Sequence, residues 1–103
     1  MTNVKEVDVQ EELQSAIESY DTVVVDFAAP AWCRPCQQFS PHYDVASTRS
    51  DAVFIAVDVD KAPWAMEEFG IQSVPTVKLF KSGEFVKNLE ARTVITLLAE
   101  INS

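Results

Sequence analysis

The chain has 103 residues, of which 48% are hydrophobic and 23% are charged, which is typical of a globular protein and excludes a disordered one. At this length we expect one domain, spanning residues 1–103, with a single hydrophobic core. The formal charge of −8 argues against nucleic acid or an anionic membrane surface as the main partner.

The first residues give no sign of a targeting segment. The stretch MTNVKEVDVQEEL carries acidic residues where a signal peptide needs an apolar run, and no stretch of the sequence is apolar for long enough to cross a bilayer. We therefore expect an intracellular, cytoplasmic protein that needs no membrane. In that compartment thiols are kept reduced and structural disulfides are rare.

The predicted elements begin with a strand over Val4–Val9, followed by a helix. Asp8 and Glu11 have the spacing of a capping box, which would start this helix. The apolar residues of its buried face recur at helical spacing: Leu13, Ala16, Ile17 and Tyr20.

A second strand and a second helix follow. Thr22–Ala28, TVVVDFA, is a short β-branched run, as expected of a strand that is buried on both faces. The segment from Cys33 to about Thr48 has a helical pattern despite two prolines. Pro35 is tolerated in the first turn, whereas Pro41 must kink the helix because proline has no N–H to donate.

The second half of the chain adds three strands and two helices. Val53–Val59 predicts a buried strand, and Asp60 and Pro63 suit the start of a short helix that ends before Gly70. The alternating run TVKLFKSGEFVKNL predicts a hairpin with Ser82-Gly83 as its two-residue turn. A last helix is indicated by apolar residues at helical spacing: Val94, Leu97, Leu98 and Ile101. Strands that alternate with helices predict an α/β fold, with a mostly parallel sheet covered on both faces.

The residues most suited to chemistry are Cys33 and Cys36, the only cysteines in the chain. A single Cys-x-x-Cys near a βαβ pattern in an intracellular chain indicates a dithiol redox motif. Cys33 opens a helix, where unpaired backbone N–H groups and the helix dipole favour the ionised thiolate. Cys36 lies one turn further in, where we expect it to be shielded from solvent. We therefore predict that Cys33 attacks a substrate disulfide and that Cys36 resolves the mixed disulfide.

A zinc site is the main alternative for the cysteine pair. A structural zinc site needs four ligands, and His42 is the only further cysteine or histidine in the chain. Half a site would have to be completed by dimerisation, so we expect no metal. We expect His42 to lie on the helix surface, nearly two turns beyond the thiols.

Several stretches in order make the whole chain resemble the thioredoxin family. They are VVVDF, WCRPC as a version of the family's W-C-G-P-C, Pro41 as the helix-kinking proline, VDVD, FGIQSVPT and LFKSGE. The resemblance implies the thioredoxin fold, a single three-layer α/β/α domain with a central mixed five-stranded sheet and four helices.

The resemblance also implies a substrate-binding surface around the cysteines. The family's cis-proline matches Pro75, beside the two sulfurs, and the backbone of Val74 would be free to pair with an extended substrate segment. Trp32 and Pro35 would form an apolar rim with Val74, on which many partly unfolded substrates can dock. Arg34, which lies between the two cysteines in the sequence, is expected to belong to the same substrate-binding surface.

Asp26 interrupts the apolar run VVVDF, so a strand buried on both faces would bury its carboxyl group behind the thiols. Burial raises the pKa of an acid. We predict that Asp26 accepts the proton of Cys36 during resolution. The alternative is an aspartate at a solvated strand end.

The chain departs from the family at several places. The family usually has an aromatic residue at Ala28, and the loop AAPA that starts there has one residue more than usual. Many members have a lysine, at the place of Ala56, that partners the buried aspartate, and its loss should leave Asp26 harder to ionise. A family glycine near the substrate groove falls on Glu90 or Ala91, which would narrow or charge the groove and restrict the partners.

Arg34 replaces the glycine that is usual between the cysteines. Its guanidinium favours the thiolate of Cys33, hence the reduced form, and so predicts a more oxidising couple than with glycine. One pKa unit corresponds to roughly 30 mV for a two-electron couple, so the chain would stay in the range of a reductase.

The family implies a monomeric protein disulfide reductase without a bound cofactor. Its redox-active disulfide, Cys33–Cys36, would receive electrons from NADPH indirectly, through thioredoxin reductase, and pass them to disulfide-containing proteins. The alternatives are a disulfide donor or isomerase, a glutaredoxin, and a thioredoxin-like binding subunit of a larger assembly. The missing signal peptide argues against a disulfide donor or isomerase. The motif WCRPC and the long hairpin argue against a glutaredoxin. The retained cysteines argue against a binding subunit, which would need neither of them.

Overall fold

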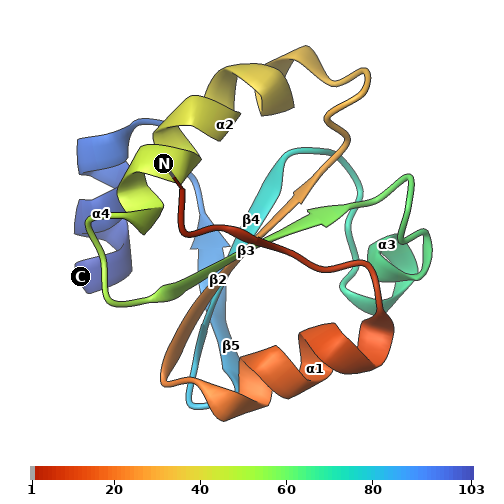
Figure 1. Ribbon diagram of the computed structural model, residues 1–103, viewed down its shortest axis with the longest axis horizontal. Coiled ribbons are helices and arrows are strands. Elements are labelled where there is room, and N and C mark those ends of the chain that lie inside the picture. The colour runs from red at the N-terminus through yellow and green to blue at the C-terminus, as the bar shows by residue number, and fades with distance from the viewer. Residues whose placement is uncertain (1) are drawn as a thin grey trace.

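The computed structural model describes residues 2–103, and in it a β-sheet lies between two layers of helices (Figure 1). The strands are β1 (Lys5–Glu6), β2 (Thr22–Ala28), β3 (Val53–Asp58), β4 (Thr76–Lys81) and β5 (Glu84–Leu89). Their order in the sheet is β1-β3-β2-β4-β5. The pairs β1–β3 and β2–β3 are parallel, and the pairs β2–β4 and β4–β5 are antiparallel.

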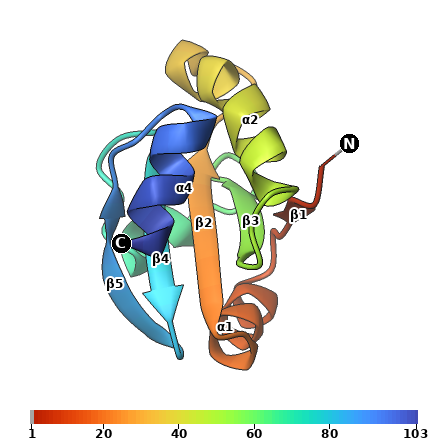
Figure 2. The same cartoon turned by 90° about the vertical axis from the view of Figure 1, so that its left-hand side faces the viewer.

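Two helices cover each face of the sheet. The helices are α1 (Gln10–Ser19), α2 (Arg34–Ser47), α3 (Trp64–Glu68) and α4 (Val94–Asn102). Helices α1 and α3 lie on one face, and α2 and α4 pack beside each other on the other, which faces the viewer in Figure 2. The predicted three layers, mixed five-stranded sheet and four helices are therefore confirmed. No helix within residues 2–103 has the length and the apolar character that a bilayer crossing needs.

Strand β2 is the central strand and supplies side chains to both faces, because successive residues of a strand point to opposite sides. Val23, Val25 and Phe27 belong to the hydrophobic cluster beneath α1 and α3. Val24 belongs to the cluster beneath α2 and α4. By the same alternation Asp26 faces α2, the helix that begins at the cysteines.

The predicted capping box of the first helix is wrong. The N-cap of α1 is Val9, and no side chain caps the helix. Instead, the indole Nε1 of Trp64 donates a hydrogen bond of 3.1 Å to the backbone carbonyl of Asp8. A contact from α3, which local spacing does not reveal, therefore fixes the chain where α1 begins.

The first strand is Lys5–Glu6, much shorter than the predicted Val4–Val9, and the residues before it bond to α2. The Thr2 hydroxyl donates to the Asp44 carboxylate, and the Asn3 amide donates to the Ser47 hydroxyl. The later elements agree with their predicted bounds to within a few residues. Ser82 and Gly83 form the predicted hairpin turn with φ of 53° and 82°, as the right-handed twist of the paired strands requires.

Candidate active site

The two cysteines form a disulfide at the N-terminus of α2, just beyond the end of β2. Their Cα atoms are 5.2 Å apart. Cys33 is the N-cap of α2, and its backbone N–H donates a hydrogen bond of 2.9 Å to the carbonyl of Ala29, which closes the loop between strand and helix. The fold thus delivers the sulfurs to the end of the most buried strand.

The sulfur of Cys33 is the natural place for a negative charge in this pair. Its Sγ accepts a hydrogen bond of 3.2 Å from the backbone N–H of Cys36, within the first turn of the helix. Unpaired N–H groups and the helix dipole make this position favourable for an anion. On reduction, the same amide is placed to stabilise a Cys33 thiolate.

Exposure does not distinguish the two cysteines. The expected shielding of Cys36 is present, with 3% of the residue exposed, but Cys33 is equally shielded at 4%. Cys33 is covered because its Sγ lies 3.7 Å from the carbonyl oxygen of Val74, in the loop before β4. The difference between the two thiols therefore rests on their position in the helix and not on access of solvent.

The residues expected to bind substrate surround the disulfide. Trp32 is 65% exposed and its Nε1 donates to the Asp60 carboxylate at 3.0 Å, so its ring stands at the surface. Arg34 and Pro35 are exposed. Val74 and Pro75 are half-buried, and the peptide bond between them is cis, as predicted.

Asp26 is buried, as predicted, with 5% of the residue exposed. Burial raises the pKa of its carboxyl group from 3.8 to about 7, although the Arg92 guanidinium opposes the rise and the Asp44 carboxylate adds to it. Its Oδ1 is buried and has no hydrogen-bond partner within residues 2–103. A carboxyl group with this pKa is present in both its protonated and its ionised form near neutral pH.

A cavity of about 750 Å³ lies behind the disulfide, and both Asp26 and Cys36 line it. Ala28 and Ala56, two of the departures from the family pattern, line the same cavity. Ala56 is the residue on β3 that pairs with Asp26 in the sheet. The small side chains therefore leave open space beside the buried carboxyl group, where a lysine would place its amine.

The loop between β5 and α4 holds a residue that the sequence analysis missed, Arg92. Its guanidinium lies 5.1 Å from the centre of the Phe39 ring. The Glu100 carboxylate accepts hydrogen bonds from the backbone amides of Glu90 (3.0 Å) and Ala91 (2.9 Å), the two places considered for the missing glycine. No local pattern marks Arg92, because its importance comes from α2 packing against this loop.

His42, expected on the surface of the second helix, is half-buried. It lines a second, smaller cavity together with Arg92 and Pro75. The histidine thus faces the same cavity as Arg92 and the cis-proline.

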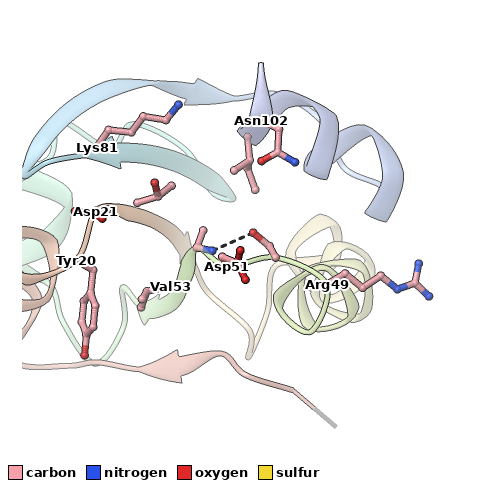
Figure 3. Close-up of a pocket in the computed structure, with 11 residues that line it drawn as sticks. Tyr20, Asp21, Arg49, Asp51, Val53, Lys81 and Asn102 are labelled. Atoms are coloured by element: carbon pink, nitrogen blue, oxygen red, sulfur yellow. Dashed lines mark hydrogen bonds between the residues drawn. The ribbon is translucent and has the colours of Figure 1, made fainter.

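A further hollow lies at the opposite end of the sheet, where β2 and β3 begin (Figure 3). Tyr20, Asp21, Arg49 and Lys81 are among its lining residues, and in it the Ser50 hydroxyl accepts a hydrogen bond of 3.1 Å from the Ala52 amide. The cysteines follow the other end of β2, so this hollow is remote from them. Within residues 2–103 there is no group of three or more His, Cys, Asp or Glu residues arranged to hold a metal ion.

Comparisons with known proteins agree with this geometry. The family model described as Thioredoxin matches residues 4–103. Thioredoxin 1 of Plasmodium falciparum is 42% identical over 87 residues, which are 84% of this chain and 83% of that protein. Thioredoxin-1 of Schizosaccharomyces pombe is 36% identical over 101 residues, which are 97% of each chain.

Solved structures of thioredoxins are also similar to this chain over nearly its whole length. A mutant thioredoxin from Halobacterium salinarum NRC-1 superposes with a TM-score of 0.88 at 31% identity, covering 97% of this chain and 88% of that one. The oxidised thioredoxin from Plasmodium falciparum gives a TM-score of 0.83 at 38% identity, covering 96% and 95%. The arrangement of strands and helices is therefore shared with these proteins over nearly the whole chain.

Proposed function

Because this chain belongs to the thioredoxin family and is a protein disulfide reductase, we propose that Cys33 is its attacking thiol and Cys36 its resolving thiol. The position of Cys33 as the N-cap of α2 supports the assignment, since the amide of Cys36 already donates to its sulfur. This single observation carries the proposal, because it favours charge on one sulfur and not on the other.

Two exchanges complete the reaction. The Cys33 thiolate bonds to one sulfur of the substrate disulfide, and the other substrate sulfur leaves as a thiolate. Cys36 then attacks the sulfur of Cys33, which releases the remaining substrate thiolate and forms the Cys33–Cys36 disulfide. Two electrons pass to the substrate, and the disulfide present in this structure is the oxidised product.

Asp26 takes the proton of Cys36 when Cys36 attacks. The two side chains line one cavity, and a carboxyl pKa of about 7 suits a group that accepts and returns a proton near neutral pH. Asp26→Asn, which cannot accept the proton, should slow the release of substrate from the mixed disulfide at least about tenfold at pH 7. Stopped-flow measurement of that release tests the role, and an unchanged rate would remove Asp26 from the mechanism.

Substrate docks as an extended segment beside Val74. The carbonyl oxygen of Val74 lies 3.7 Å from the Cys33 sulfur, so a strand paired with this backbone would bring its own disulfide to the nucleophile. The exposed Trp32, Arg34 and Pro35 form the rest of the docking surface, and Pro75 lies at its edge.

The partners follow from the chemistry. Each turnover leaves the protein oxidised, so a thioredoxin reductase that uses NADPH would restore the dithiol, and disulfide-containing proteins would consume it. No cofactor needs to be bound for either half of this cycle. We place the protein in the cytoplasm, as a monomer.

Reduction of insulin disulfides with NADPH and a thioredoxin reductase tests this function. We expect turnover by the wild type, none by Cys33→Ser, and accumulation of a mixed disulfide by Cys36→Ser. Activity retained by a variant with both cysteines changed to serine would show that the chain acts as a scaffold. An equilibrium titration against glutathione separates a reductase from a disulfide donor, which would be the stronger oxidant.

A further inference from the structure

A cavity of about 350 Å³ lies on the α4 side of the disulfide, apart from the one that contains Asp26. Its walls come from the first half of α2, the cis-proline and the loop before α4. The lining residues are Pro35, Gln38, Phe39, His42, Pro75 and Arg92. This cavity adjoins the reactive centre, because Pro35 lies between the two cysteines and Pro75 follows the residue that touches the Cys33 sulfur.

Arg92 is held in place by backbone carbonyls and makes no hydrogen bond to an acidic residue within residues 2–103, although its charge acts on the buried carboxyl group of Asp26. Its Nη1 donates hydrogen bonds to the backbone carbonyls of Leu89 (2.8 Å) and Ala91 (3.0 Å), and its guanidinium lies over the ring of Phe39. Within residues 2–103 the N–H groups of its Nη2 and Nε make no hydrogen bond. The guanidinium is therefore oriented in advance and retains donors for a ligand.

The acidic side chains of the same corner do not supply that ligand. The Glu100 carboxylate is occupied by the backbone amides of Glu90 and Ala91. Glu90 itself is exposed. Arg92 is one of only eight Lys and Arg residues in a chain of net charge −8, so a half-buried arginine beside the active site is not part of a generally basic surface.

A bound substrate can reach this cavity. An extended segment rises about 3.3 Å per residue, so the side chain two positions from the attacked cysteine lies on the same face of the segment and roughly 7 Å away. The volume of about 350 Å³ is more than large enough for one side chain. His42 adds a second polar group to the wall, and the two prolines and Phe39 add apolar surface for the stem of that side chain.

From this geometry we infer that the cavity is a specificity subsite that binds the carboxylate of a substrate Asp or Glu close to the disulfide. The inference rests on the proposed function and names a substrate class for it. A guanidinium and a carboxylate form a bidentate, charge-assisted pair, which neutral side chains of the same shape cannot form. Arg92 contacts the substrate in this scheme and takes no part in the exchange of sulfurs.

The test uses disulfide peptides with acetylated and amidated ends, so that the varied side chain is the only source of a carboxylate. Two matched pairs carry Glu or Gln, either two residues before or two residues after the attacked cysteine. We expect kcat/KM of the wild type to favour Glu over Gln by about tenfold at one of the two positions. A ratio near one at both positions would overturn the inference.

Variants assign the preference to Arg92. In Arg92→Gln the ratio should fall to about one, while the Gln peptide is still reduced. Arg92→Lys keeps the charge but not the planar pair of donors, so its ratio should fall to less than half that of the wild type. Because the ratio is taken within each variant, an effect on the cysteines or on stability cancels. If Arg92→Gln does not fold, Arg92→Lys serves as the test. An unchanged ratio of Glu to Gln peptide reduction in Arg92→Lys would then overturn the inference.

Arg49→Gln is the matched control, because it removes the same charge at the opposite end of the sheet, and we expect it to keep the full preference. A loss of preference in Arg49→Gln equal to that in Arg92→Gln would show an effect of overall charge and overturn the subsite. If the Glu and Gln peptides are reduced equally well, the subsite is contradicted and the proposed function is not. If none of the peptides is reduced, both the proposed function and the subsite are contradicted.

Discussion

The carboxyl group of Asp26 links the reaction to the stability of the fold. Its pKa is raised from 3.8 to about 7 by burial, so the folded state binds the proton more tightly than the unfolded state does. In the window between these two pKa values the unfolded chain has lost its proton and the folded chain has kept it. The contribution of Asp26 to the free energy of unfolding therefore falls as the pH rises from about 4 to about 7 and then stays level.

Asp26→Asn removes the free-energy cost of ionising a buried carboxyl group in the folded state. We expect the oxidised variant to exceed the wild type in free energy of unfolding by up to about 4 kcal/mol at pH 8, and to gain little at pH 4. Denaturant unfolding at the two pH values measures the difference. Asp51→Asn, which removes an exposed acid, is the control without a pH-dependent gain. An equal gain at both pH values would mean that the asparagine improves packing and that the ionisation of Asp26 is not the cause.

Arg34 concerns the redox couple and not the fold, since its side chain is exposed in the first turn of α2. Removal of its positive charge beside Cys33 destabilises the thiolate and with it the reduced form. Arg34→Gly should therefore lower the reduction potential. The expected decrease is roughly 30 mV for each unit by which the pKa of the Cys33 thiol rises. Equilibration with glutathione measures the shift, and Arg34→Lys, which keeps the charge, should shift it less. A higher potential in Arg34→Gly would show that this sign is wrong.

At the scale of elements, the register between β2 and β3 decides how Asp26 is tuned. Ala56 pairs with Asp26 and lines the same cavity. A lysine introduced there would place its amine in the open space beside the carboxyl group. We expect Ala56→Lys to lower the pKa of Asp26 by about 1 to 3 units, because an opposite charge a few ångströms away favours the ionised form.

Carbon-13 NMR titration of the Asp26 carboxyl group measures that pKa directly. Ala56→Met, with a side chain of similar length and no charge, is the matched control and should not lower it. If both variants lower the pKa alike, the cavity volume and not the amine controls Asp26. If neither does, the two strands do not bring the new side chain to the carboxyl group.

The same elements show what the sequence could predict. The buried run around Asp26, the cysteine helix and the hairpin turn at Ser82-Gly83 were predicted correctly, because local spacing and composition determine them. The cap of α1 was predicted wrongly, since Trp64 reaches across from α3 to the backbone of Asp8. Arg92 was missed altogether, and its cavity exists only because α2 and the loop before α4 pack together.

The whole molecule carries a charge of −8, which acts over longer distances than any single pair. Its field should steer positively charged substrates toward the surface before contact. For a peptide with lysines far from its disulfide, kcat/KM should fall several-fold between about 10 mM and about 300 mM salt, as the Debye length shortens. A neutral peptide of the same length should change little. A salt effect of equal size on both would indicate that ions act on the cysteines themselves.

Long-range steering and the preference at Arg92 are compatible, because they act at different distances. Screening at physiological salt confines the general field to about 8 Å, whereas a carboxylate in contact with a guanidinium is screened much less. A substrate with basic residues at a distance and one acidic residue beside its disulfide would satisfy both. This pattern is a substrate profile that neither the family nor the net charge suggests alone.

The spacing of the cysteines also determines what each turnover does to the rest of the molecule. The disulfide joins residues only three apart in sequence, so it closes a very small ring. In the loop-entropy treatment such a ring restricts the unfolded chain by only about 2 kcal/mol, against nearly 5 kcal/mol for a ring of about 100 residues. Breaking the bond therefore costs the fold about 2 kcal/mol, which lowers the melting temperature of a domain of about 100 residues by roughly 8 to 16 °C. Each time the protein is reduced we therefore expect it to melt at a lower temperature than its oxidised form, although by less than half of what a disulfide closing a ring of about 100 residues would cost.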